Sequence, residues 1–186
     1  ITNLYIATER ENIEIIECLL NHPEIDINLQ TEITNIDYED NDETSDTVIQ
    51  SALFVAVEHE NINIVKLFLS NKSININLNS KSIEWFSGST YEQSVLRLAI
   101  SINNFEIVDL LLKQPNINIE SFDYFINESC RIIEPLLFYA VKYRNPKIVQ
   151  LLLSRDDVDV NSKFKKIYYK MDENNKFTIE DYVNYE

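Results

Sequence analysis

The stretch SALFVAVEHENINIVKLFLSNKSININ, residues 51–77, decides the fold of this chain. Its first half, SALFVAVEHE, groups small and apolar side chains ahead of a charged end. In its second half the apolar residues recur at the spacing of one helical face, at Ile64, Val65, Phe68 and Leu69. Two helices of about ten residues each are too short to be stable alone in water. The stretch therefore predicts a helix pair that needs neighbours.

Three further copies of this pattern occur in the chain with the same internal spacing. The copies begin with TNLYIA (2–7), SALFVA (51–56), SVLRLA (94–99) and PLLFYA (135–140), and each keeps a leucine and, three residues later, an alanine. Each copy ends in an extended segment, which reads IDIN, ININ, INIE or VDVN. Chance does not give four helical patterns in register, so the spacing predicts repeats at about residues 1–28, 51–77, 94–120 and 135–161.

The four hexapeptides resemble the T-P-L-H-x-A signature of ankyrin repeats, and segments such as IVKLFL resemble the second helix of that family. The resemblance implies a turn, two helices and a protruding finger per repeat, stacked into a solenoid. We therefore expect an all-α ankyrin-repeat solenoid of about four helix-turn-helix repeats with extended β-hairpin or loop fingers. We expect residues 1–186 to be one such domain and a fragment of a longer protein.

The chain departs from the family at the turns between the helices, where ankyrin repeats usually carry glycine. The only glycine is Gly88, and the turn positions hold Glu11, Glu60, Asn103 and Arg144. We interpret this as a divergent subtype with a rebuilt turn. The residues that follow are expected to cap the second helices, and they are Asn12, Asn61, Asn104 and Asn145.

The repeats are also longer than the family's usual period of about 33 residues. Successive signature leucines lie 49, 43 and 41 residues apart, and the surplus falls between the extended exit and the next leucine. This predicts long fingers at residues 29–50, 78–93 and 121–134. Residues 162–186 are expected to form a fourth finger and then either a partial fifth repeat, starting near Phe177, or a cap.

The charge of the chain is large and uneven. The net charge is −15, and residues 1–50 hold thirteen acidic side chains and one basic one, whereas residues 137–186 hold eight and nine. The acidic end repels phosphate, so nucleic acid is excluded as a partner and a protein with a basic surface is expected. No apolar run approaches the 18 or so residues of a membrane span, so no membrane contact is expected within this segment.

The sequence shows no pattern typical of catalysis. One glycine excludes glycine-rich phosphate loops, and His22 and His59 have no partners at metal-ligand spacing. We expect no enzymatic activity, cofactor or metal. Cys18 and Cys130 form no disulfide framework, which indicates a reducing, intracellular and cytoplasmic setting, and Cys18 is expected to be a small buried residue.

The resemblance places partner binding on the concave face of the first helices and on the fingers. The positions expected to face the concave side are Glu9, Arg10, Glu58, His59, Ser101, Ile102, Lys142 and Tyr143, and the finger candidates are Asp40, Asp42, Trp85 and Tyr91. The acidic finger is either a solvated loop or an electrostatic hook for a basic partner. The aromatic residues of the second finger either pack back on the stack or anchor a partner.

The sequence therefore predicts a monomeric protein-interaction module. Three alternatives stay open at this point. The segment can be a regulatory or scaffolding part of a larger protein whose activity lies elsewhere. It can associate with itself, with its acidic first end against the basic last end of another copy. It can also hold a small molecule or metal among its fingers.

Overall fold

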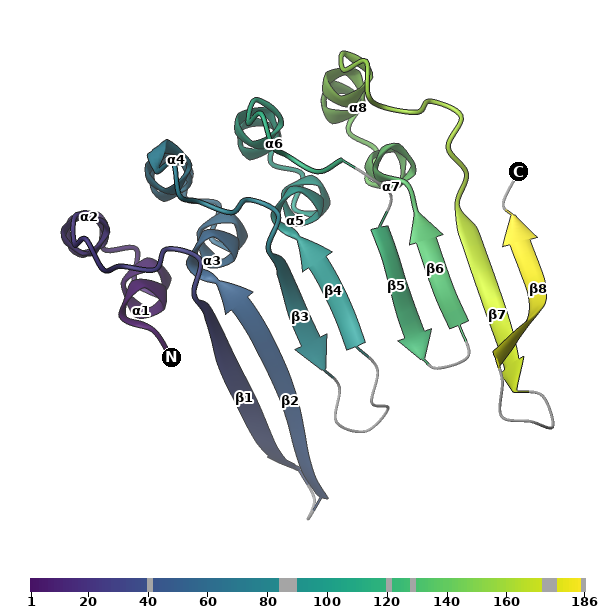
Figure 1. Cartoon of the computed structure of the whole chain (residues 1–186), viewed down its shortest axis with the longest axis horizontal. Coiled ribbons are helices and arrows are strands. Elements are labelled where there is room, and N and C mark those ends of the chain that lie inside the picture. Colours follow the sequence, from purple (N-terminus) through teal and green to yellow (C-terminus); the bar gives the residue numbers. More distant parts are fainter. Residues whose placement is uncertain (40–41, 84–89, 120–121, 128–129, 172–176, 185–186) are drawn as a thin grey trace.

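The computed structural model describes residues 1–39, 42–83, 90–119, 122–127, 130–171 and 177–184. Within them, helices follow one another in pairs: α1 (Asn3–Glu9) with α2 (Ile13–Leu20), α3 (Ala52–Glu58) with α4 (Ile62–Ser70), α5 (Val95–Ser101) with α6 (Phe105–Leu112), and α7 (Leu136–Lys142) with α8 (Pro146–Leu153). Figure 1 shows them in two rows, with α1, α3, α5 and α7 beside the strands and the other four farther away. We call these rows the inner and the outer helices. The stacked pairs form the predicted solenoid.

Strands follow each helix pair and form antiparallel hairpins. They are β1 (Gln30–Glu39), β2 (Asp42–Ser51), β3 (Asn79–Ile83), β4 (Thr90–Ser94), β5 (Phe122–Asn127), β6 (Cys130–Glu134), β7 (Lys165–Met171) and β8 (Phe177–Asn184). Neighbouring hairpins also pair with each other, so that the described strands make two four-stranded sheets, β1-β2-β3-β4 and β5-β6-β7-β8. The all-α class is therefore too narrow, and the molecule is a helical solenoid with sheet-forming fingers.

The pairing between hairpins explains why the fingers are sheets and not separate loops. Residues 47–49 of β2 pair with residues 81–83 of β3, and residues 130–133 of β6 pair with residues 165–168 of β7. The pairing segments are rich in β-branched side chains, which favour extended backbone. Pairing also covers strand edges that would otherwise expose unpaired backbone groups.

The structure contradicts one of the two alternatives expected for the last part of residues 162–186. Phe177–Asn184 is strand β8, which pairs with β7 along the whole of Lys165–Met171. A partial fifth repeat starting near Phe177 is therefore wrong, because this segment finds its hydrogen-bond partner in the neighbouring strand and not in a helix.

The turns between inner and outer helices keep the left-handed backbone without glycine. Glu11, Glu60, Asn103 and Arg144 have φ values of 52°, 55°, 63° and 58°. The interpretation of a rebuilt turn is therefore wrong at these positions. A left-handed residue with a Cβ atom costs roughly 1–2 kcal/mol, so surrounding contacts must hold each turn.

The predicted asparagine caps are confirmed, and each of the last three also joins two repeats. The Oδ1 atom of Asn61 accepts from the backbone N–H of Ile64 at 3.2 Å, while its Nδ2 donates to Glu11 Oε2 at 2.5 Å. Asn104 and Asn145 repeat this arrangement toward Glu60 and Asn103, at 2.8 and 2.6 Å. The left-handed turn residue of one repeat is thus held by the cap of the next.

Asn61→Ala is expected to lower the free energy of unfolding by about 1–2 kcal/mol, because it removes both the cap and the bond to Glu11. Chemical denaturation followed by circular dichroism measures this change. The control is Asn63→Ala on the exposed face of α4, which should change the free energy of unfolding by less than about 0.5 kcal/mol. Equal losses for the two variants would contradict the role of the cap.

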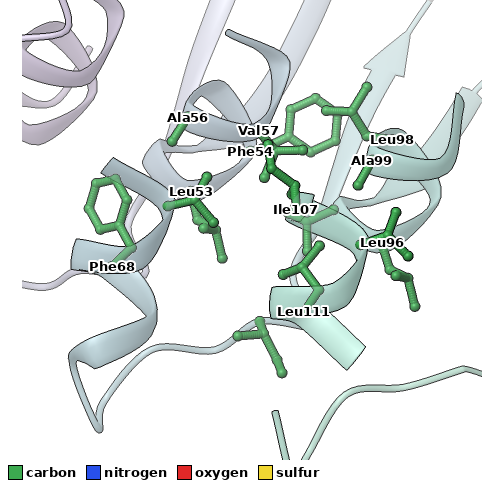
Figure 2. Packing of buried hydrophobic residues seen from close by; sticks show 14 of the residues in the cluster. Leu53, Phe54, Ala56, Val57, Phe68, Leu96, Leu98, Ala99, Ile107 and Leu111 are labelled. Carbon is green, nitrogen blue, oxygen red and sulfur yellow. The ribbon is translucent and has the colours of Figure 1, made fainter. Parts of the chain in front are cut away.

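One hydrophobic core runs through all four helix pairs. The signature alanines Ala7, Ala56, Ala99 and Ala140 are at most 5% exposed, and Figure 2 shows Ala56 and Ala99 among the leucines and valines of two neighbouring repeats. Because burial of apolar surface contributes about 25 cal/mol per Å², the stacking of repeats and not any single repeat holds the fold.

Cys18 does not belong to this core. The structure places its side chain on the exposed surface of α2, so the expectation of a buried residue is wrong. The equivalent positions in α4, α6 and α8, at Leu67, Leu110 and Leu151, are only half-buried. The outer helices therefore leave this register position near solvent.

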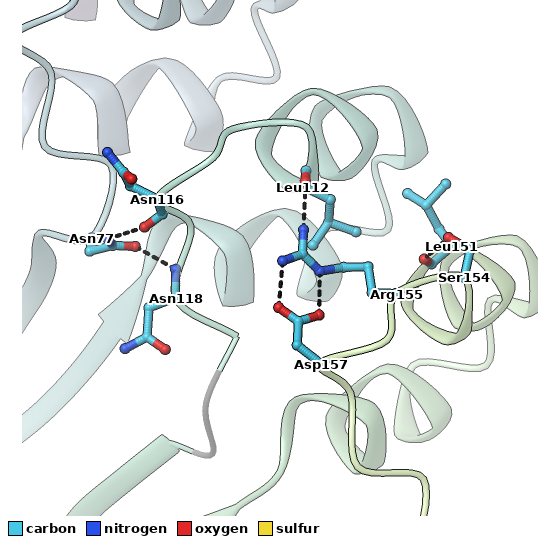
Figure 3. Close-up of polar contacts among 8 residues, drawn as sticks. All are labelled: Asn77, Leu112, Asn116, Asn118, Leu151, Ser154, Arg155 and Asp157. Carbon is cyan, nitrogen blue, oxygen red and sulfur yellow. Dashed lines mark hydrogen bonds and ion pairs between the residues drawn. The ribbon is translucent and has the colours of Figure 1, made fainter.

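A second line of hydrogen bonds joins the repeats beyond the outer helices. Asn77 Nδ2 donates to the carbonyl oxygen of Asn116 at 2.7 Å, and Asn77 Oδ1 accepts from the backbone N–H of Asn118 at 2.8 Å (Figure 3). Asn28 makes the equivalent two bonds to the second repeat, at 2.8 and 2.7 Å. The polar residue that ends an extended exit therefore fixes the register between neighbouring repeats.

Arg155 makes a further contact of this kind between the third and fourth repeats. Its Nη1 donates to the carbonyl oxygen of Leu112 at 2.7 Å, and its other guanidinium nitrogens bind both carboxylate oxygens of Asp157 (Figure 3). This bidentate contact lowers the pKa of Asp157. Arg155 thus hydrogen-bonds a carbonyl oxygen at the C-terminal end of α6 and connects this helix to the loop after α8.

Candidate functional site

The ends of the inner helices form a continuous row across the four repeats. In each repeat the row contains the last residue of the inner helix, its C-cap and the left-handed turn residue, at residues 9–11, 58–60, 101–103 and 142–144. We call these twelve residues the turn row. They include all eight residues predicted to face the concave side.

The turn row at repeats 1 and 2 is acidic, and two of its carboxylates lie near a tyrosine that contacts the first hairpin. Tyr5 in α1 is buried, and its hydroxyl accepts from Gln50 Nε2 in β2 at 3.0 Å. Burial raises the pKa of Tyr5, and the carboxylates of Glu9 and Glu58 raise it further. Glu9 and Glu58 therefore lie close enough to Tyr5 to act on its pKa, and both side chains are exposed.

His59 links the acidic residues of the first two repeats. Its Nε2 lies 3.9 Å from Glu9 Oε2, and its Nδ1 lies 3.9 Å from Glu11 Oε1. A protonated imidazole would therefore form ion pairs with both carboxylates.

Ionisation of the Glu58 carboxyl is less favourable in the folded chain than in the unfolded chain. Partial burial raises its pKa, Glu9 raises it further, and His59 acts in the opposite direction. A raised pKa means that the folded chain binds this proton more tightly than the unfolded chain, so the ionised form is destabilising above that pKa.

Glu58→Gln is therefore expected to raise the free energy of unfolding at pH 7, by up to about 0.5 kcal/mol for this exposed side chain. The gain should shrink as the pH falls through the raised pKa of Glu58 and disappear below the pKa of the unfolded chain, because the carboxyl is then neutral in the folded and the unfolded chain alike. Urea denaturation at pH 7 and pH 4 measures the difference. In contrast, Glu106→Gln should lower stability at pH 7, because Glu106 lies in the first turn of α6, where the helix dipole favours a negative charge.

The turn row at repeat 4 is basic and aromatic. Lys142 Nζ lies 3.6 Å from Glu134 Oε1, yet its side chain is 60% exposed. The Tyr139 and Tyr143 hydroxyls are hydrogen-bonded to each other at 3.3 Å, and the two rings are tilted by 56° with their centroids 4.8 Å apart. The hydrogen bond with Tyr139, together with burial, raises the pKa of Tyr143 to about 12, so this phenol stays protonated.

A buried ion pair supports this end of the row and was not predicted from the sequence. The guanidinium of Arg97 in α5 binds the carboxylate of Glu134 in β6, and each side chain is 2% exposed. The Arg97 guanidinium also lies 4.1 Å from the centre of the Tyr139 ring. One signal was available: Arg97 occupies the register position where the other repeats carry Tyr5, Phe54 and Phe138.

The other predicted residues fall into two groups. Ile102 is half-buried against the core, and the Ser101 hydroxyl donates to the carbonyl oxygen of Leu98, so these two offer less to a partner than Arg10, which is exposed. In the second finger, Tyr91 is 42% exposed in β4, and its pKa is raised by burial while Arg97 acts to lower it. Tyr91 thus lies near the basic end of the turn row.

The remaining finger candidates cannot be placed in the same way. Asp40 and Trp85 lie outside the described residues, and Asp42 begins β2 with its side chain outside them. In the part of the chain that the structure describes, no group of three or more His, Cys, Asp or Glu side chains is arranged to hold a metal ion. None of the described helices is long and apolar enough to cross a membrane.

Comparison with known families agrees with this architecture. A model of three ankyrin repeats matches residues 4–123, and a model of a single ankyrin repeat matches residues 135–165. No curated protein matches the chain. The two matched segments together cover all four helix pairs except Asn3, the first residue of α1, and the first segment alone spans more than half of the sequence. The chain therefore belongs to the ankyrin repeat family.

Proposed function

We propose that this chain is a protein-interaction module that binds a protein partner through the turn row and the neighbouring roots of the hairpins. Ankyrin repeats generally mediate protein–protein interaction and are typically non-catalytic. The observation that carries the proposal for this chain is the contrast between two sets of positions. The core residues are alike from repeat to repeat, while the turn row changes from acidic to neutral to basic.

The chemistry of the turn row supports this role. Arginine and tyrosine are enriched among residues that dominate binding energies at protein interfaces, and this row presents Arg10, Tyr143 and Arg144 at exposed positions. Glu58 presents an exposed carboxylate at the acidic end of the row. We also propose that the finger residues Tyr91, Trp85, Asp40 and Asp42 widen this contact surface.

Capture of a partner tests the proposal. The tagged chain is incubated with an extract of the source cell, and captured proteins are compared with those bound by Glu58→Ala/His59→Ala/Lys142→Ala/Tyr143→Ala. We expect the fourfold variant to capture at least about tenfold less partner than the unchanged chain, since a few central residues carry most of the binding energy. The reason is that it removes charged and aromatic side chains from both ends of the turn row.

The matched control changes four exposed residues on or beside the outer helices, Asn63, Lys66, Lys72 and Lys147, to alanine. This variant should capture the same partner as the unchanged chain. Circular dichroism of both variants checks that the helix content is unaltered. Loss of the partner in the control, with retention in the turn-row variant, would place binding on the opposite side of the solenoid and contradict the proposal.

A further inference from the structure

The charge of the turn row changes sign along the solenoid. With histidine neutral, the three residues of each repeat carry −1 (residues 9–11), −2 (residues 58–60), 0 (residues 101–103) and +2 (residues 142–144). The change is not an effect of one position. The first residue of each triplet runs Glu, Glu, Ser, Lys, and the third runs Glu, Glu, Asn, Arg.

The nearby groups that face the row leave this gradient in place. At the acidic end, Tyr5 is neutral at physiological pH, as phenols are, and the neighbouring Gln50 carries no charge. At the basic end, Glu134 is already bound by Arg97, so its approach to Lys142 leaves that corner positive. Arg144 adds a second, exposed positive charge.

The row is long enough to contact several residues of an extended partner segment. Successive inner helices are in contact, α1 with α3, α3 with α5 and α5 with α7. Packed helices lie about 8–10 Å apart, so three steps separate the first and fourth triplets by about 25–30 Å. An extended segment of about eight or nine residues covers that length.

From this geometry we infer that the turn row binds one segment of a partner protein in a fixed direction. The basic residues of the partner segment lie against repeats 1 and 2, and its acidic residues lie against repeat 4. The inference rests on the proposed function and names the chemistry of the partner. Charge complementarity along a groove fixes the register and excludes segments of the opposite polarity. A second copy of the chain is a poorer occupant, because a net charge of −15 makes copies repel.

A two-block peptide tests the direction of binding. The probe is a block of four lysines joined to a block of four glutamates through a flexible linker of twelve glycines and serines, whose root-mean-square length is about 19 Å before the blocks are added. A nitroxide label is attached at the lysine end in one sample and at the glutamate end in another. The isotopically labelled chain is titrated at low salt, where surface charges are weakly screened, and the loss of amide signal near the label is recorded.

The lysine-end label is expected to remove more than half of the amide signal at residues 9–11 and 58–60, and the glutamate-end label to do so at residues 142–144. In Lys142→Gln/Arg144→Gln, the loss caused by the glutamate-end label should disappear while the loss caused by the lysine-end label remains. Neutralisation is used because a carboxylate at position 142 would repel the buried Glu134. The matched control, Lys72→Gln/Lys147→Gln, removes two exposed charges outside the row and should behave as the unchanged chain.

Two results would overturn the inference. One is that both labels affect the same triplets, or that neither affects the turn row. The other is a dimer at low salt, detected by light scattering and removed by Lys142→Gln/Arg144→Gln, which would make a second copy the occupant. Capture of a partner from the cell extract reports on the proposed function alone, so either experiment can fail without the other.

Discussion

Glu134→Ala is expected to lower the free energy of unfolding by about 3–5 kcal/mol, because it leaves the guanidinium of Arg97 buried without its carboxylate. Both side chains are 2% exposed, so water cannot replace the lost partner. Arg97 lies under the Tyr139 ring at 4.1 Å and cannot swing outward without breaking the packing between the third and fourth repeats. Urea denaturation monitored by circular dichroism measures the loss.

Two further variants separate the ion pair from simple truncation. Arg97→Leu/Glu134→Leu removes both charges and fills the space, so it should cost less than the single change, since replacing a buried pair by apolar groups is often close to neutral. Glu32→Ala, at an exposed position of β1, should change stability by less than about 0.5 kcal/mol. A loss below about 1 kcal/mol for Glu134→Ala would show that this ion pair does not hold the two repeats together.

Phe68→Ala should also cost about 3–5 kcal/mol, because it opens a cavity in the continuous core. Phe68 is fully buried between α4 and its neighbours, and Figure 2 shows it beside Leu53 in the interior of the stack. The midpoint and slope of urea denaturation measure the loss. Since each repeat depends on its neighbours, the transition should move to lower urea as a whole.

The matched control removes the same side chain from the surface. Phe105 is the first residue of α6 and is 38% exposed, so Phe105→Ala should lose clearly less free energy than Phe68→Ala. Similar losses for the two phenylalanines would contradict a core that passes through the second repeat. A denaturation curve that splits into two transitions only in Phe68→Ala would place the weak point of the solenoid at that repeat.

The features that recur in the sequence are those that could be predicted from it. The spacing of leucine, alanine and asparagine in each copy fixes which residues begin, cap and bury the helices. The structure bears this out at Asn12, Asn61, Asn104 and Asn145. Because the pattern occurs four times, a deviation in one copy does not change the helix positions that the other copies predict.

The features that join different repeats could not be predicted in the same way. The ion pair of Arg97 and Glu134 connects residues 37 apart, and nothing local in either segment indicates the other. Pairing between hairpins, such as β2 with β3, depends on how closely the stack brings two fingers together. The exposure of Cys18 depends on how the outer helices pack around this register position, which is only half-buried at Leu67, Leu110 and Leu151 and which the spacing of the letters does not contain.

The candidate site was predictable in position but not in environment. Register placed Glu9, Glu58, Lys142 and Tyr143 at equivalent helix ends, and the structure locates them there. Only the structure shows that Ile102 packs inward, because its exposure is set by the neighbouring repeats. Residues at equivalent register positions therefore do not contribute equally to a binding surface.

Amide hydrogen exchange, measured on the chain alone and bound to its captured partner, tests the central claim most directly. We predict slower exchange on binding in residues 9–11, 58–60, 101–103 and 142–144 and in the adjoining hairpin roots, with no change in the outer helices α2, α4, α6 and α8. Slower exchange confined to the outer helices, with the turn row unaffected, would contradict the claim that this row is the surface through which the solenoid binds.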